Sequence, residues 1–264
     1  MSMTINSNAP GHEDTTLLES VTIVLPCLNE QENVAEAVAQ ARSAAARHAL
    51  HHEVVVVDDG STDHTRIIAE ALAHRHPDVR VVAHEGNRGY GAAVRSGIRA
   101  SRCRWVLLTD GDLQFDLGEM TRMLPATADH DLIAGYRIDR ADPVARRLAA
   151  HAWNLLMRRT FGVSVRDVDC AFKLIRGDAL RALDLRSDGA MISTELFVRA
   201  AQAGLRITEV GVHHRPRVAG DSSGGDPRVV LRAFRERRAL LAELRGRGAH
   251  AARRSGRHAA AGAS

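Results

Sequence analysis

The chain is poor in the residues that build crosslinked, zinc-bound or membrane-spanning proteins. Only three of its 264 residues are cysteines, Cys27, Cys103 and Cys170, and none belongs to a C-x-x-C pair. This spacing argues against a disulfide framework or a zinc site and fits a reducing compartment. No apolar run approaches the roughly 18 residues of a membrane-spanning helix, and the polar first residues lack a secretory signal. We therefore expect a cytoplasmic protein.

Aromatic residues are also scarce, at 3% of the chain, and the formal net charge is only +4. Single-stranded nucleic-acid sites combine a basic groove with aromatic stacking, so we expect no nucleic-acid partner. Most of the positive excess lies after residue 227. Two interpretations of this basic end stay open. It is a final helix docked on the core, or an amphipathic helix in peripheral contact with the anionic inner face of the membrane.

Hydrophobic residues make up 45% of the chain, enough for a sizeable core. Short apolar, β-branched runs alternate with helical patterns through the first half of the sequence. These runs cover residues 21–25, 53–57, 79–83 and 105–109. The alternation predicts an α/β fold: a doubly wound, mostly parallel sheet flanked by helices, as one domain. We place this domain at 19–244, between a flexible leader at 1–18 and a basic, disordered tail at 245–264.

Polar residues follow the predicted strands, where ligands bind in parallel sheets. Asn29 follows the first strand, and Glu32 three residues later predicts a capping box at the start of the first helix. Ser61 follows the second strand and is predicted to cap the second helix.

The stretch 106–116, VLLTDGDLQFD, is an apolar strand that ends in two acids separated by one glycine. The charges of Asp110 and Asp112 repel unless a cation lies between them or one of them is protonated. Mg²⁺ or Mn²⁺ prefers oxygen ligands and would resolve this repulsion. Gln114 offers a neutral oxygen, and Asp116 is a further candidate ligand. A short D-x-D is common in ordinary turns, so the motif alone is weak evidence.

The D-x-D motif belongs to an ordered series that extends over residues 20–225. The series comprises 26–30 (PCLNE), 58–63 (DDGSTD), 87–91 (NRGYG), 110–114 (DGDLQ), 135–137 (GYR), 169–173 (DCAFK), 194–195 (TE) and 217–222 (RVAGDS). With this series the chain resembles the inverting glycosyltransferases of family 2, which have the GT-A fold. Within them it is most similar to polyprenyl-phosphate sugar transferases of the dolichyl-phosphate mannose synthase type.

The resemblance implies a site for a nucleotide-diphosphate sugar, with Glu30 near the ribose and Asp58 and Asp59 near the base. The residues implied for this site are Pro26, Asn29, Glu30, Asp58, Asp59, Gly89, Asp110, Gly111 and Asp112. Those implied for a Mg²⁺ or Mn²⁺ ion are Asp110, Asp112 and Gln114. The glycine loop 87–91 lacks the third glycine of a dinucleotide fingerprint and follows the third strand, so we expect no nicotinamide cofactor.

The resemblance also implies cations that face the leaving diphosphate or an acceptor phosphate. These are Arg137, Lys173 and Arg217, with Arg215 and His214 as adjacent alternatives. Arginine binds phosphate in a bidentate manner, and lysine acts as a point charge. The predicted catalytic groups are Asp112, Arg137, Lys173 and Arg217 with Glu195 and Asp169, and those predicted for an acceptor phosphate are Arg137, Lys173, Arg215 and Arg217.

The acceptor decides whether a general base is needed. A hydroxyl acceptor needs one, and Glu195 and Asp169 are the candidates. A phosphate acceptor is already anionic and needs none. We predict metal-dependent inverting transfer from a GDP- or UDP-sugar to a polyprenyl phosphate. The alternatives are transfer to a hydroxyl of a small molecule and a non-catalytic protein that binds nucleotide sugars.

Overall fold

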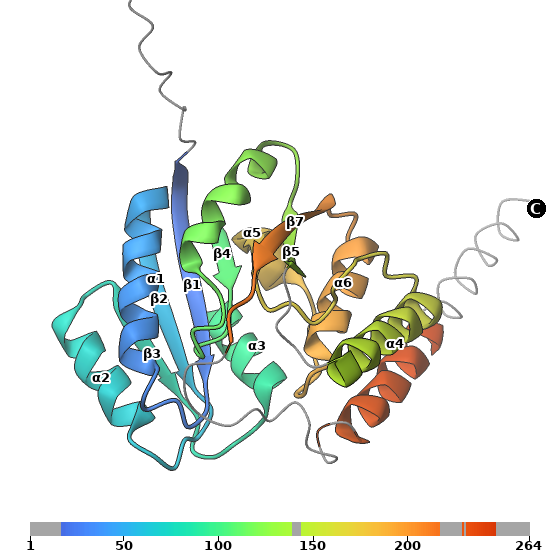
Figure 1. Ribbon diagram of the computed structural model, residues 1–264, viewed down its shortest axis with the longest axis horizontal. Helices are drawn as coiled ribbons and strands as arrows, with labels where there is room; N and C mark the ends of the chain where they lie inside the picture. The colour runs from blue at the N-terminus through green and yellow to red at the C-terminus, as the bar shows by residue number, and fades with distance from the viewer. Residues whose placement is uncertain (1–16, 139–143, 217–228, 230, 247–264) are drawn as a thin grey trace, which may run out of the picture.

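The computed structural model describes residues 17–138, 144–216, 229 and 231–246 (Figure 1). The strands are β1 (Leu18–Cys27), β2 (Ala49–Asp58), β3 (Val79–Ala83), β4 (Trp105–Leu108), β5 (Leu132–Ile138), β6 (Lys173–Arg176) and β7 (Ile207–His213). The α-helices are α1 (Val34–His48), α2 (Thr65–Arg75), α3 (Tyr90–Ala100), α4 (Val144–Phe161), α5 (Gly177–Ala182) and α6 (Ile192–Gln202). Two 3-10 helices, η1 (Leu117–Arg122) and η2 (Leu124–Ala128), follow β4. Residues 231–246 form a further helix, here called the last helix.

The strands form one mixed sheet in the order β3-β2-β1-β4-β6-β5-β7. Within it β6 alone runs against its neighbours, β4 and β5, and the other pairs are parallel. The predicted mostly parallel sheet is therefore confirmed. Because β6 is reversed, its first residue, Lys173, pairs with Leu108, the last residue of β4. Lys173 thus lies at the edge where the parallel strands end.

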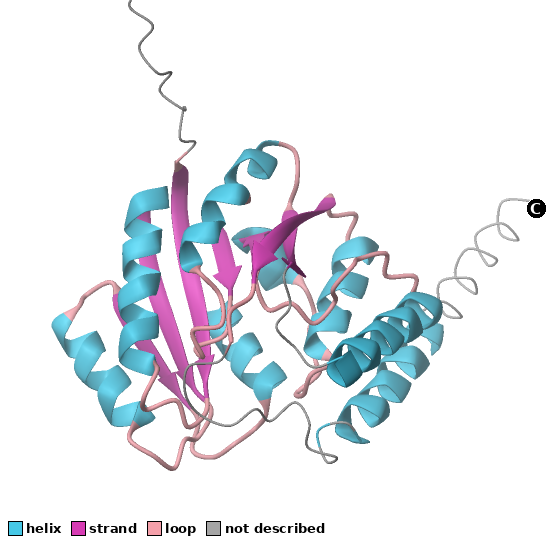
Figure 2. Cartoon of the chain, viewed as in Figure 1, coloured by secondary structure: helices cyan, strands magenta, loops and turns pink. Residues whose placement is uncertain are grey.

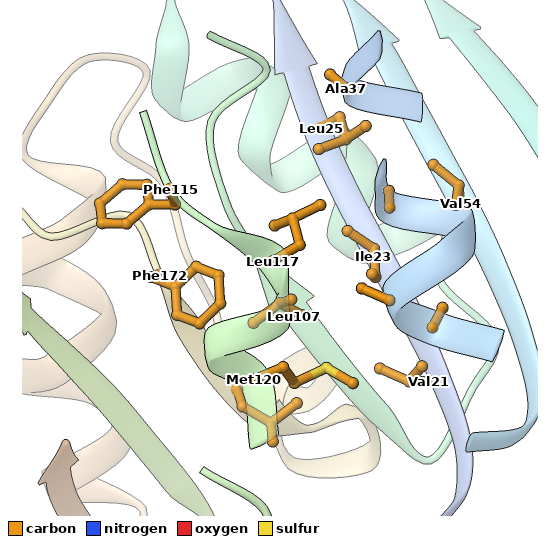
Figure 3. Close-up of a cluster of buried hydrophobic side chains, with 14 of the residues drawn as sticks. Val21, Ile23, Leu25, Ala37, Val54, Leu107, Phe115, Leu117, Met120 and Phe172 are labelled. Atoms are coloured by element: carbon orange, nitrogen blue, oxygen red, sulfur yellow. The ribbon is translucent and has the colours of Figure 1, made fainter. Parts of the chain in front are cut away.

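Helices cover both faces of the sheet (Figure 2). One apolar cluster packs α1 and η1 against one face (Figure 3), and a second packs α3 and α6 against the other. In β2, Val54 and Val56 belong to the first cluster, and Val55 and Val57 belong to the second. Successive side chains of a strand point to opposite faces, so a strand buried on both sides is a continuous apolar run.

The starts of the first two helices differ from the predicted caps. Asn29 has a positive φ of 56°, and its side-chain oxygen accepts a hydrogen bond from the Thr62 amide at 2.9 Å. The Ser61 hydroxyl accepts from the Asn29 amide at 2.9 Å. At the start of α2, Asp63 accepts from the Thr65 amide at 2.9 Å. Both capping predictions are wrong, because Asn29 and Ser61 bind the two loops to each other.

The predicted leader and tail fall mostly on residues 1–16 and 247–264, which lie outside the described residues. Among the residues that the structure describes, no helix combines the length and apolar character needed to cross a bilayer.

The last helix lies beside α4 (Figure 1), where Arg237 donates to the Thr160 hydroxyl at 3.0 Å. The described part of the basic end is therefore a helix docked on the domain.

Candidate active site

The predicted site residues of β1, β2 and β4 converge where these strands end. Burial, followed by the charges of Glu30, Asp58, Asp110 and Asp112, raises the pKa of the Cys27 thiol. The charges of all four carboxylates therefore act on one buried thiol at the end of β1. Parallel strands end at one edge of a sheet, which explains how positions far apart in the sequence meet.

Asp110 lies in an unusual environment for a carboxylate. Its Oδ1 is buried and has no hydrogen-bond partner among the described residues. Burial and then the charge of Asp112 raise its pKa to about 6, against a hydrogen bond from Tyr90 and the charges of Lys173 and Arg137. A buried oxygen without a partner beside a second carboxylate suits a hard divalent cation. Within the described part of the chain, no group of three or more His, Cys, Asp or Glu is placed to hold a metal.

A tight turn places Asp112 beside Asp110. Asp112 is 8% exposed, and its Oδ1 accepts from the Gln114 amide at 3.1 Å. A Cβ on Gly111 would lie 2.7 Å from the Cys27 sulfur, so only glycine fits this turn without a shift. The Gln114 side-chain nitrogen donates to the Arg215 carbonyl at 3.2 Å. This bond directs the Gln114 amide toward the segment after β7, and its predicted role as a metal ligand gains no support.

Lys173 is a buried cation that lies where the parallel strands end. It is 2% exposed, and its ammonium donates to the Cys170 carbonyl and lies 5.4 Å from the Phe197 ring centroid. Burial lowers the pKa of Lys173, although the charges of Cys170, Asp169, Asp167 and Asp110 oppose this. No salt bridge to Lys173 occurs within the described ranges.

Arg137 approaches the same site from the end of β5. It forms a bidentate pair with Asp167, at 2.7 Å and 2.8 Å. Asp167 is a site residue that sequence reasoning missed, although it stands two residues before the Asp169 of a quoted motif. Asp169 is exposed, and its charge acts on both Arg137 and Lys173.

Arg215 and His214 contact residues of the segment that follows β4. The Arg215 guanidinium pairs with Asp116 at 2.6 Å, and both line a hollow of about 370 Å³ beside α1. The structure therefore places Arg215 with Asp116 and not with Lys173. His214 stands edge-on to Phe115, with ring centroids 5.1 Å apart. Arg217 lies outside the described residues.

The two acids at the end of β2 are both buried. Asp59 is 3% exposed, and it accepts from the Arg88 amide at 3.0 Å and the Gly89 amide at 2.8 Å. His84 Nδ1 lies 2.6 Å from the same carboxylate. Asp58 is 1% exposed and accepts from the backbone at 3.2 Å. Asp59 therefore holds the glycine loop, which the sequence pattern did not reveal.

Glu30 lies in the loop after β1, where the resemblance predicts it. It is 8% exposed and accepts from the Asn33 side chain at 2.6 Å, and its amide donates to the Thr65 hydroxyl at 2.7 Å. Pro26 precedes it within β1 and pairs with Val57 of β2. Glu30 is thus fixed between the first two strand-end loops, beside the acids of β4.

Both carboxylate oxygens of Glu195 are engaged by residues of the protein. It is 1% exposed, and its Oε2 accepts from the Arg186 amide at 3.0 Å and the Ser187 amide at 2.7 Å. Its Oε1 accepts from Arg199 at 2.8 Å, and Arg199 also pairs with Glu243 of the last helix. Both oxygens are engaged by donors, which disfavours the predicted role of Glu195 as a general base.

Comparison with known proteins identifies the family. Residues 22–184 match the family described as Glycosyl transferase family 2. The chain is 31% identical over 222 residues to undecaprenyl-phosphate 4-deoxy-4-formamido-L-arabinose transferase of Pseudomonas fluorescens, covering 82% of this chain and 63% of that protein. It is 30% identical over 233 residues to dodecaprenyl-phosphate galacturonate synthase of Rhizobium johnstonii, covering 85% of this chain and 66% of that protein. The chain thus spans slightly less than two thirds of these relatives' length.

The fold is shared with solved glycosyltransferases. The chain superposes on glucosyl-3-phosphoglycerate synthase from Mycobacterium tuberculosis, in complex with Mn²⁺ and UDP-glucose, with a TM-score of 0.62. The identity is 20%, over 83% of this chain and 79% of that one, so the likeness concerns the GT-A fold alone. The family match and the relatives confirm the resemblance predicted from the motifs. The chain belongs to glycosyl transferase family 2.

Proposed function

We propose that the protein is a metal-dependent inverting glycosyltransferase that moves a sugar from a GDP- or UDP-sugar to a polyprenyl phosphate. Relatives named as undecaprenyl- and dodecaprenyl-phosphate transferases, 30–33% identical to this chain, support the acceptor class. This chain spans under two thirds of the length of these relatives. The proposal therefore depends on what the site itself favours.

The buried ammonium of Lys173 is the observation that best supports a phosphate-binding site. A buried charge is costly unless a counter-charge and hydrogen bonds compensate it. Lys173 has a carbonyl, an aromatic face and the nearby charges of Asp169, Asp167 and Asp110, but no salt bridge among the described residues. A phosphate group would supply the missing charge and acceptor oxygens. Lys173 and Arg137 thus suit the leaving diphosphate or the acceptor phosphate.

Asp110 and Asp112 are the residues that would hold Mg²⁺ or Mn²⁺. The unpartnered Asp110 oxygen and the mutual repulsion of the two carboxylates favour a cation there. When bound, the metal would neutralise charge that develops on the departing diphosphate. The protein offers too few ligands alone, so substrate and water oxygens would complete the shell.

The reaction that fits these groups is direct displacement. An oxygen of the acceptor phosphate attacks the anomeric carbon, and the bond from that carbon to the diphosphate oxygen breaks with its electron pair. Lys173 and Arg137 would stabilise the developing negative charge. In this proposal Glu30 and Asp58 contact the nucleoside, and Asp59 shapes the loop that contains Gly89. No proton has to be removed from the nucleophile.

The environment of Glu195 favours a phosphate over a hydroxyl acceptor. A hydroxyl needs a general base, and the donors around Glu195 leave the exposed Asp169 as the remaining candidate. A soluble acceptor hydroxyl is the second function to test. A non-catalytic binding protein is less favoured, since it has no need of a buried lysine beside the paired acids.

We also propose that the last helix contacts an anionic membrane surface. Both of its acids are engaged inward, Glu236 with the Gly189 amide and Glu243 with Arg199. Its outer face lacks acids and combines exposed apolar and basic residues. These are Leu231, Phe234, Arg235, Arg238 and Arg245. Such a face suits binding in the headgroup region of anionic lipids.

A release assay tests the proposed function. Purified protein is given GDP- or UDP-sugars with Mn²⁺ or Mg²⁺, with and without a short-chain polyprenyl phosphate, and nucleoside diphosphate is measured. We expect release that needs the lipid phosphate and stops with EDTA or in Asp112→Ala. Release that needs a hydroxyl compound instead would overturn the proposed acceptor class, and no release would overturn the proposed transferase activity.

Sedimentation with anionic vesicles tests the proposed membrane contact. We expect Phe234→Ser to bind less than wild type, and equal binding would contradict the contact.

A further inference from the structure

The inner face of the last helix contacts the glycine loop 87–91. The Arg232 Nη2 donates to the Arg88 carbonyl at 3.1 Å. The Arg232 Nη1 lies 2.7 Å from the place where a Cβ on Gly89 would stand. Residues from distant parts of the chain thus meet at a loop that sequence analysis placed beside the donor site.

The same helix holds a second segment that supports this loop. Glu236 accepts from the Gly189 amide at 2.8 Å and pairs with Arg232 at 3.1 Å. The neighbouring Asp188 carbonyl accepts from the Gly91 amide at 2.8 Å, in the first turn of α3. The last helix therefore acts on the start of α3 both directly and through residues 188–189.

The opposite side of the loop is held by Asp59, which accepts from two of its amides. Gly89 has φ 106° and ψ 156°, a conformation that favours glycine. The next residue, Tyr90, begins α3, and its phenol lowers the pKa of Asp110 against the effect of burial. A shift of the loop would therefore move a side chain that acts on the metal-binding acid.

We propose that Arg232 is a positioning residue for the nucleotide-sugar side of the site, because it fixes loop 87–91 in the conformation in which Tyr90 reaches Asp110. The inference rests on the proposed function, in which this loop borders the donor. The Arg232 side chain is 43% exposed, so its ion pairs add little to global stability. Its removal should change the loop without unfolding the protein.

Kinetics of Arg232→Ala, Arg232→Lys and Arg237→Ala test this role. We expect Arg232→Ala to raise the donor KM about threefold to tenfold, as for one or two accessible hydrogen bonds, with kcat within about twofold. The reason is that fewer molecules hold the competent loop, which weakens apparent affinity. Arg232→Lys should recover part of the loss, since a lysine can still donate to the Arg88 carbonyl. Arg237 lies on the same helix but donates to the Thr160 hydroxyl of α4, and Arg237→Ala should match the wild-type donor KM.

Hydrogen exchange without substrate separates this inference from the proposed function. We expect the Gly91 and Ala92 amides to exchange faster in Arg232→Ala, with an unchanged Tm. Unchanged exchange and unchanged KM would overturn the positioning role. A lowered Tm with reduced kcat and normal KM would also overturn it, because that pattern indicates general destabilisation. Faster exchange in a protein whose wild type binds no nucleotide sugar would overturn the proposed function, and the positioning role with it.

Discussion

Replacing Asp110 with Asn is expected to stabilise the metal-free protein while abolishing its activity. Burial and then the charge of Asp112 raise the Asp110 pKa from 3.8 to about 6. A pKa unit corresponds to about 1.4 kcal/mol, so the ionised carboxylate disfavours the folded state by at most about 3 kcal/mol. Asn removes the charge and keeps the size and shape of the side chain.

The pH dependence of this effect has a defined sign. The folded protein holds the Asp110 proton more tightly than the unfolded chain, so the contribution favours folding at low pH. This contribution is lost as pH rises through about 4 to 6, after which the wild type stays at its lower stability. The advantage of Asp110→Asn is therefore largest above pH of about 6 and falls to roughly half near pH 5.

Thermal unfolding in EDTA, near pH 8 and near pH 5, measures this difference. Each kcal/mol should change Tm by roughly 2–4 °C for a protein of this size. The control is Asp116→Asn, because Asp116 is 42% exposed, pairs with Arg215 and accepts from the Gly118 amide. It should give no stabilisation. A lower Tm for Asp110→Asn, or a gain that does not change with pH, would refute the reasoning.

Three further substitutions test the site and the core. Lys173→Met should lower kcat/KM by about 100-fold or more without loss of stability, because it removes a charge that binds phosphate and is costly to bury; steady-state rates near wild type would contradict this. Glu195→Gln should lower the free energy of unfolding by about 3 kcal/mol, since it leaves the buried Arg199 partly uncompensated. Urea unfolding measures this, and intact stability with a collapsed kcat would point to a base instead. Gly97→Ala should lower the free energy of unfolding by about 1–3 kcal/mol, because the added Cβ would clash with the Val24 side chain. Thermal unfolding measures this, and an unchanged Tm would argue against tight packing of α3 on the sheet.

The parallel part of the sheet was predictable, because a continuous apolar run is compatible with few types of structure. The continuous run at 54–57 indicates a strand buried on both faces, and the helices between such runs imply parallel neighbours. The direction of β6 was not predictable, because four residues carry no signal for parallel or antiparallel pairing. That reversal is what brings Lys173 to the strand ends, so the sequence could name this residue but not explain its place.

The site shows a second limit of sequence reasoning. A motif identifies an acid but not the direction of its carboxylate. Asp59 accepts from the glycine loop and Glu195 from the 186–187 backbone. These partners come from distant segments and depend on tertiary packing. Arg215 likewise pairs with Asp116, which no spacing rule connects to it.

Analysis of the lipid product tests the central claim most directly. The protein is incubated with a labelled nucleotide sugar, a divalent metal and a short-chain polyprenyl phosphate, and the organic and aqueous phases are separated. We predict that the sugar enters the organic phase in a one-to-one ratio with released nucleoside diphosphate, as a glycosyl phosphate with inverted anomeric configuration. Diphosphate release with free sugar in water, or sugar linked to a hydroxyl, would contradict the account.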